Sequence, residues 1–139
     1  KHGDESVVKA VDEVESLYKG GPHSETSQPK GDGLDSHHCP AKTCYEGAPI
    51  SSADGPAIKM DPADHRETSS YGNKPGAVAY RARQQKLLKE GNLMDAIQMD
   101  IDDVRRIEIL IGQPGKYDEA VREMLRYAST LDPSRFIKP

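Results

Sequence analysis

The sequence predicts an α+β domain in which two short strands come before a set of helices. Residues 34–60 contain two short strand-like stretches, separated by a segment rich in Gly, Pro, Ser and Asp. The second half of the chain repeats apolar residues at every third or fourth position, which is typical of amphipathic helices. The 139 residues suit one domain, and 35% hydrophobic residues with 5% aromatics indicate a modest, mostly aliphatic core.

The N-terminal segment has a different composition from the rest. Apolar residues at helical spacing predict a helix over residues 5–19. Residues 20–33 are rich in Gly, Pro, Ser and Lys, and we interpret them as a flexible linker. We therefore divide the chain into an N-terminal helix with its linker, residues 1–33, and a domain over residues 34–139.

A strand-strand-helix unit opens the predicted domain. The second strand, within residues 55–60, leads directly into Asp61 and Pro62, which mark a helix start. Asp can accept hydrogen bonds from the free N–H groups of the first turn, and Pro at the first helical position loses no bond. We expect that helix to end at Gly72 after about three turns, so the unit spans residues 34–72.

Three longer helices are predicted in the rest of the domain, which we place over residues 73–131. Their apolar residues keep helical spacing over residues 75–90, 93–111 and 116–131. Asn92 is a good cap for the second of them.

Composition and charge exclude some classes of protein. The net charge is -4, so binding to nucleic acid would need a local basic face. No apolar run approaches the roughly 20 residues of a membrane span, and we expect no membrane partner. Cys39 and Cys44 do not form the framework of a disulfide-rich secreted protein.

Three of the five histidines fall at the two ends of the strand-strand-helix unit. His37 and His38 are adjacent on the first strand, and His65 lies in the first turn of the helix. Neighbours on a regular strand point to opposite faces, so a shared pocket needs an irregular strand end, which Pro40 supports. The other histidines, His2 and His23, lie in polar sequence and are expected to be solvated.

These residue types suit hydrolysis of a phosphodiester. Such a reaction needs a base for water and a cation that neutralises charge on the phosphate. Histidine is mostly neutral near pH 7 and can act as the base, and imidazole and carboxylate groups bind divalent metals. We expect His38 to be the base, with His37, His65 and either Asp61 or Asp64 as metal ligands.

The residues around these histidines resemble a known family. The Asp-Ser-His-His run at residues 35–38, with residues 60–68 (Met-Asp-Pro-Ala-Asp-His-Arg-Glu-Thr), resembles the HNH, or His-Me finger, endonucleases. The likeness is closest to the His-His nuclease domains at the C-termini of bacterial polymorphic toxins. It covers residues 34–72, about a third of the chain.

This resemblance implies a ββα-metal core and one divalent ion, Mg²⁺ or Mn²⁺, with Zn²⁺ and Ni²⁺ as alternatives. It implies that His38 activates water while His37 and His65 hold the metal. It also implies DNA as substrate, an immunity protein as partner, and an attached delivery module that type VI or related secretion systems carry into a target cell. The sequence departs from the family at the central Asn, for which Asp54 is the nearest substitute.

A non-catalytic alternative uses the same residues differently. Cys39 and Cys44 could join His37 and His65 in a structural zinc site, which would be closed by four ligands. A toxin nuclease acting on RNA is a second alternative. Asp61 could instead cap the helix, and Asp64 could stabilise its positive end.

A local basic face is available for phosphates. The first long helix and its N-terminal flank, residues 74–90, carry five basic residues against one acidic residue. Residues 92–103 carry four Asp and no basic residue, and we expect that face to avoid DNA. The predicted nucleic-acid contacts are Lys59, Arg66, Lys74, Arg81 and Arg83.

Overall fold

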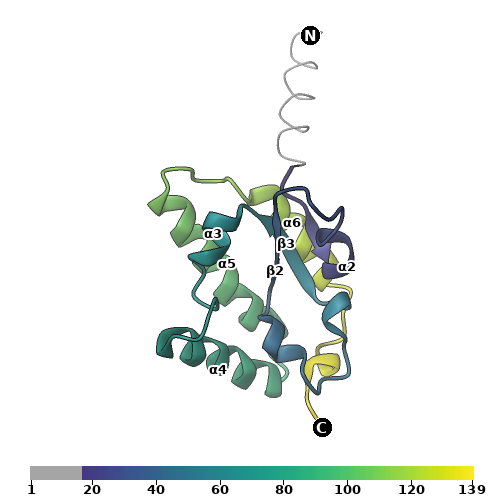
Figure 1. Cartoon of the computed structure of the whole chain (residues 1–139). Coiled ribbons are helices and arrows are strands. Elements are labelled where there is room, and N and C mark those ends of the chain that lie inside the picture. Colours follow the sequence, from purple (N-terminus) through teal and green to yellow (C-terminus); the bar gives the residue numbers. More distant parts are fainter. Residues whose placement is uncertain (1–16) are drawn as a thin grey trace.

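Helices surround a small antiparallel sheet in the computed structural model, which describes residues 17–139 and has an α+β fold (Figure 1). The strand order is β1-β3-β2, with both pairs antiparallel. The α+β class predicted from the sequence is therefore confirmed. The strands are β1 (Gly20–Pro22), β2 (Asp35–His38) and β3 (Pro56–Met60).

The helices follow the predicted positions in the second half of the chain. The three long helices start and end within three residues of the predicted limits. The helices are α2 (His23–Thr26), α3 (Pro62–Arg66), α4 (Pro75–Lys89), α5 (Leu93–Leu110) and α6 (Asp118–Ala128), with 3-10 turns η1 (Lys42–Tyr45), η2 (Ser52–Asp54) and η3 (Pro133–Phe136).

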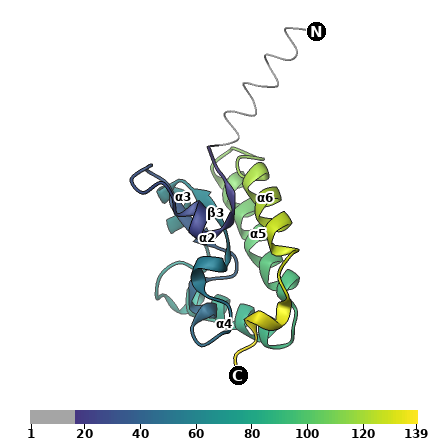
Figure 2. The same ribbon diagram turned by 90° about the vertical axis from the view of Figure 1, so that its right-hand side faces the viewer.

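The core lies between the sheet and the two C-terminal long helices. Helix α6 packs across β1 and β3, and α5 lies beside it (Figure 2). All five residues of β3 are buried, because the strand is paired on both edges and covered by helices. Its Ile58 and Met60 join Ile97, Val104 and Met124 in the hydrophobic cluster.

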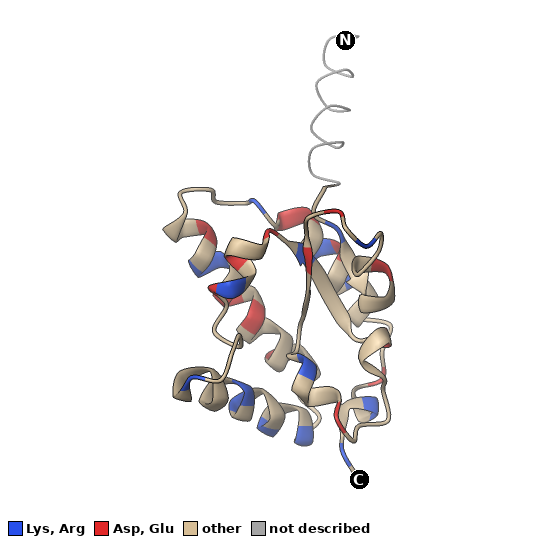
Figure 3. Ribbon diagram, in the orientation of Figure 1, with Lys and Arg blue, Asp and Glu red and all other residues tan. Residues whose placement is uncertain are grey.

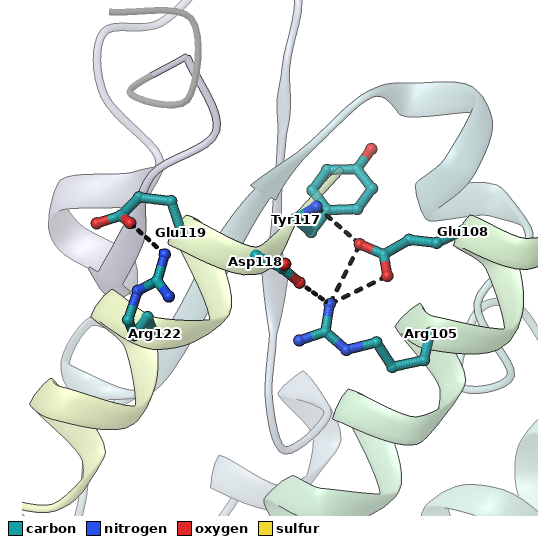
Figure 4. Close-up of polar contacts among 6 residues, drawn as sticks. All are labelled: Arg105, Glu108, Tyr117, Asp118, Glu119 and Arg122. Carbon is teal, nitrogen blue, oxygen red and sulfur yellow. Dashed lines mark hydrogen bonds and ion pairs between the residues drawn. The ribbon is translucent and has the colours of Figure 1, made fainter. Parts of the chain in front are cut away.

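A buried carboxylate joins α5 to α6. Glu108, only 2% exposed, accepts hydrogen bonds from the Arg105 guanidinium at 3.0 and 3.3 Å and from the Tyr117 backbone N–H at 2.7 Å (Figure 4). Arg105 also binds Asp118 at 2.5 Å. A buried charge is tolerated only when it is paired in this way, so the network holds the turn between the helices in place.

The predicted linker is wrong for residues 20–26. These residues form β1, which pairs with β3, and α2, which packs against the sheet. The glycines permit close packing here: a Cβ on Gly20 would lie 1.8 Å from the Ala120 backbone oxygen. Most of the helix predicted over residues 5–19 cannot be compared, because residues 5–16 lie outside the described residues. Residues 17–19 are described and are not helical.

Helix α3 is shorter than predicted. It ends at Arg66, not at Gly72, because the following residues take other partners. The Thr68 hydroxyl donates to the His65 carbonyl at 2.7 Å, and the Ser69 N–H donates to Asp103 at 2.7 Å. The loop that starts here runs to α4.

No helix in the described part of the chain is long and apolar enough to cross a membrane.

Replacing Gly20 with Ala should destabilise the domain. The added Cβ would collide with the α6 backbone and push β1 away, an overpacking cost of about 1–3 kcal/mol in the free energy of unfolding. Urea unfolding followed by circular dichroism measures it. The matched control is Gly76→Ala in the first turn of α4, where the new methyl group meets no atom within 4 Å. Equal stability of the two variants would mean that β1 does not pack on α6.

Candidate active site

The three histidines of the predicted site line one cleft. Its volume is about 320 Å³, and it opens between β2, α3, η1, the loop of residues 70–73 and the middle of α4. The lining residues are Ser36, His37, His38, Ala41, Lys42, Thr43, His65, Ser70, Tyr71, Gly72, Asn73 and Arg81.

The position of β2 explains how adjacent histidines reach one cleft. Residues Asp35 and His37 project from one face of the strand, and Ser36 and His38 project from the other. The strand order leaves β2 at an edge of the described sheet, with one side unpaired. A cleft along that edge can therefore receive side chains from both faces. The pairing with β3 continues as far as His38, so the irregular strand end expected from Pro40 is not required.

His37 is buried with an unused ring nitrogen. The residue is 3% exposed, and its Nε2 has no hydrogen-bond partner among the described residues. Burial, with smaller contributions from His65 and His38, lowers the pKa of His37 to about 3. Its ring therefore stays neutral near pH 7, and its centroid lies 5.2 Å from that of His65.

His65 is oriented by a carboxylate. Its Nδ1 lies 2.8 Å from an Asp35 oxygen, and a carboxylate can only accept, so Nδ1 carries the proton. In the neutral ring Nε2 then has a free lone pair. Histidines that bind metals are commonly held this way, with the other ring nitrogen donating to a carboxylate.

His38 is held from the opposite face. Its Nε2 lies 2.9 Å from the Ser52 carbonyl oxygen, so Nε2 donates and Nδ1 of the neutral ring can accept a proton. Burial lowers the pKa of His38 to about 4, although the Ser52 hydrogen bond acts against this shift. The ring stacks on His23, with centroids 4.1 Å apart.

The expectation that His23 is solvated is wrong. It is half-buried between His38 and Ser36, and its Nδ1 lies 2.8 Å from the Ser36 hydroxyl oxygen. That hydroxyl is also 2.5 Å from the hydroxyl of buried Thr26. Burial lowers the pKa of His23, and the Lys42 charge lowers it further. The other such histidine, His2, lies outside the described residues.

Two imidazoles could hold a metal ion. One ion at the usual distance of roughly 2.0–2.1 Å from each nitrogen fits the 5.2 Å separation of the His37 and His65 rings. The buried, unpaired His37 Nε2 is the feature that such an ion would satisfy. Among residues 17–139, no three His, Cys, Asp or Glu side chains gather in a metal-binding group.

Asp61 and Asp64 do not line the cleft, so the structure does not bring these predicted ligands to His37 and His65. Both carboxylates bind the Lys116 ammonium, at 2.7 and 2.8 Å. Asp61 also accepts from the Tyr18 hydroxyl at 2.9 Å, and Asp64 from Tyr117 at 2.5 Å. The Asp61 side chain does not cap α3, although the residue stands at the cap position.

The zinc alternative would need Cys39 and Cys44 beside His37 and His65, and the described residues contain no group of three or more potential ligands. Cys39 and Cys44 are each 1% exposed. Burial raises the pKa of Cys39 and raises that of Cys44 to about 11, which opposes the thiolate form that binds zinc.

The predicted phosphate-binding residues divide into two groups. Arg81 lines the cleft, while Arg66, Lys74 and Arg83 line a neighbouring one. Basic residues run along α4 (Figure 3). Lys59 does not fit the prediction, because it is 6% exposed and its ammonium lies 2.5 Å from Asp32.

Part of the acidic stretch is not surface. Asp100 is 1% exposed and accepts from the Tyr80 hydroxyl and from Gln84, both at 2.7 Å. Burial raises the pKa of Asp100 to about 7. Asp103 is also buried and binds Ser69, so only the remaining carboxylates of residues 92–103, those of Asp95 and Asp102, face solvent.

Several site residues were missed by the sequence analysis. Asp35 could have been found, because a residue two positions before His37 shares its strand face. Lys42, Tyr71 and Asn73 come from loops and turns, whose place beside the histidines no local pattern reveals.

Comparisons of the chain with protein-family models, with curated proteins and with solved structures each found no match.

Acid should weaken folding through His37. The unfolded ring binds a proton near pH 6.5 and the folded ring only near pH 3, so stability falls as pH drops through this window, by up to about 1.4 kcal/mol per pH unit. We expect the free energy of unfolding of His37→Asn to depend less steeply on pH between 7 and 5. Urea titrations of both proteins measure this.

The buried Asp100 acts in the opposite direction. Its folded pKa of about 7 makes stability fall as pH rises toward 7. Because Asp100 is present in both proteins, the difference between their slopes isolates His37. Parallel slopes would show that His37 is not desolvated.

Proposed function

We propose that this chain is a metal-dependent endonuclease that hydrolyses phosphodiester bonds of DNA. The observation that carries the proposal is the cleft in which buried His37, carboxylate-oriented His65 and carbonyl-oriented His38 meet. Each ring has one nitrogen without a partner. The Ser52 bond of His38 leaves its Nδ1 as an acceptor, the Asp35 bond of His65 leaves its Nε2 as an acceptor, and His37 Nε2 is unpaired among the described residues. The β2-β3-α3 order supports a ββα-metal unit as part of the same proposal.

His38 is the general base in this proposal. Its Nε2–H is engaged by Ser52, so Nδ1 takes the proton from water as the oxygen attacks phosphorus. Its pKa of about 4 keeps the ring neutral, and therefore able to accept a proton, across the physiological range. Stacking on His23 limits rotation of the ring.

His37 and His65 are the residues that hold the metal. The ion supplies positive charge for the phosphate oxygens and the departing oxygen. We expect Mg²⁺ or Mn²⁺, and Zn²⁺ and Ni²⁺ belong in the same assays because imidazole suits them well. The contribution of the chain is to keep the His37 ring neutral by burial and to orient the His65 ring through the Asp35 hydrogen bond, which leaves Nε2 of His65 available to the ion.

Lys42 and Arg81 supply further positive charge at the cleft. Arg81 donates to the Ser70 and Gly72 carbonyls at 2.6 and 2.7 Å, which fixes the loop over the cleft. Lys42 shows no such bond in the described residues and lies free to meet a phosphate.

We further propose the biological setting that the sequence resemblance implies. The domain would be the antibacterial part of a toxin, attached to a delivery module, carried by a secretion system into the cytoplasm of a target cell and neutralised by an immunity protein in the producing cell. The basic residues of α4 offer one surface for such a partner by charge complementarity.

Plasmid cleavage tests the reaction. The purified chain is incubated with supercoiled DNA and Mg²⁺, Mn²⁺, Zn²⁺ or Ni²⁺, and with EDTA. We expect nicking that EDTA abolishes, and RNA of matched length shows which nucleic acid is preferred. His38→Ala should lose roughly 10²- to 10⁴-fold in rate at every metal concentration, because it lacks the base.

His65→Ala should instead be partly rescued by more metal, since it lacks a ligand. The Mn²⁺ affinity of each variant, measured by calorimetry, separates the two roles. If folded His38→Ala cleaves at the wild-type rate, His38 is not the base. If His38→Ala loses metal affinity while His37→Ala keeps it, the two neighbours have exchanged roles.

Asp35→Asn should weaken metal binding by roughly 10- to 100-fold. The amide oxygen can still accept from His65 Nδ1, but the negative charge that strengthens His65 as a ligand is lost. Mn²⁺ titration calorimetry measures the effect. Asp95→Asn, an exposed Asp on α5, is the matched control and should bind as the wild type does. Equal affinity of both variants would remove Asp35 from the site.

Producing the wild-type chain inside bacteria should stop growth, and His38→Ala should not. Growth curves after induction, with immunoblots to equalise protein amounts, measure this. If the active wild-type chain accumulates without slowing growth, the toxin setting is wrong, while the proposed phosphodiester hydrolysis is unaffected.

A further inference from the structure

A second cleft adjoins the candidate active site. Its volume is about 730 Å³, and its lining shares Tyr71, Gly72 and Asn73 with that of the first cleft, so the two clefts are neighbours on either side of this loop segment. It lies between the end of α3 and α4. The remaining lining residues are Arg66, Glu67, Thr68, Ser69, Lys74, Gly76, Ala77, Tyr80 and Arg83.

Tyr71 stands at the junction of the two clefts. It is 46% exposed, although large aromatic side chains are usually covered. Its ring meets His65 in a T-shaped contact, with centroids 5.2 Å apart and planes at 88°. That contact covers at most one face of the phenol ring, and the 46% exposure leaves part of the ring accessible to a ligand next to His65.

The loop that carries Tyr71 is braced. Arg81 binds the carbonyls of Ser70 and Gly72 on both sides of Tyr71, at 2.6 and 2.7 Å. These two hydrogen bonds fix the backbone that carries the Tyr71 ring. Less conformational entropy of the loop is therefore lost when a ligand stacks on the ring.

The linings of the two clefts are positively charged. Lys42 and Arg81 line the first cleft, and Arg66, Lys74 and Arg83 line the second. Glu67 is the one acidic residue among the described residues that line either cleft. Cations on both sides of an open aromatic ring are the arrangement with which proteins hold single strands, whose phosphates follow the charge while bases stack.

We propose that the two clefts form one binding track for single-stranded nucleic acid, with an unpaired base stacked on Tyr71 next to the phosphate that the histidines cleave. This inference rests on the proposed function and names its substrate class. A base inside a duplex has both faces covered by its neighbours, so Tyr71 can stack only on an unpaired or flipped base.

Binding is measured without cleavage, by fluorescence anisotropy in EDTA. The probes are a labelled DNA 12-mer, RNA of the same sequence, and the DNA duplex. We expect the wild type to prefer the single strands, and Tyr71→Ala to lose roughly 5- to 100-fold in single-strand affinity with little change for the duplex. Tyr71→Phe keeps the ring and should bind as the wild type does.

Two lysine variants test the role of positive charge in the same binding experiment. Lys74→Ala, at the second cleft, should weaken binding more than Lys89→Ala, which changes another exposed lysine, at the end of α4 and outside both clefts. Circular dichroism confirms that each variant is folded. Equal single-strand affinity of Tyr71→Ala and wild type, duplex preference, or equal effects of the two lysines would overturn the proposal.

The same proteins separate this inference from the proposed function. A wild type that binds single strands through Tyr71 but never cleaves them with any metal refutes the nuclease, and the track remains as a binding site. A wild type that cleaves plasmid DNA while Tyr71→Ala cleaves and binds equally well keeps the nuclease and refutes the track. The RNA arm identifies which strand the track prefers.

Discussion

The pairing between β2 and β3 sets the geometry of the whole candidate site. Ile58 of β3 is paired with His37, and Ala57 with His38. Because Ile58 and Met60 are fully buried, the core holds β3 in one register, and β2 follows it through the ladder. A slip of one residue would turn His37 toward His23 and His38 toward His65. The roles of the two neighbours therefore depend on hydrophobic burial one strand away.

A network of hydrogen bonds, rather than the small hydrophobic core, holds helix α3 in place. Helix α3 has five residues, too few to be stable alone, yet it must present His65 accurately. Tyr117 supports it: its hydroxyl accepts from the Asp61 N–H at 3.1 Å and donates to Asp64, while its own N–H donates to Glu108. Hydrogen bonds thus run from α5 through the start of α6 to the helix that carries His65. Asp61 and Asp64, which we expected to bind a metal, instead hold α3 in place through this network.

The sequence was informative where a local period or cap decides the structure. It predicted the α+β class, the long helices and the two strands, because apolar spacing reports the buried face directly. It also predicted that His37, His38 and His65 would line one cleft, since a strand-strand-helix unit brings its first strand close to its helix. It failed where distant segments decide: β1 and α2 depend on α6, the end of α3 on Asp103, and Lys59 on Asp32. Such pairings leave no periodic trace in the chain.

The contact between β1 and α6 has a consequence for the order in which the chain matures during synthesis. Gly20 lies against Ala120, so the first strand can pair with β3 early but gains its packing against α6 only after that helix has left the ribosome. His23 follows that strand directly and supplies the ring on which His38 stacks. A nascent chain that ends before α6 thus holds all three cleft histidines in sequence, but it lacks the helix that packs on the strand leading into His23. Completion of the site is coupled to the synthesis of α6.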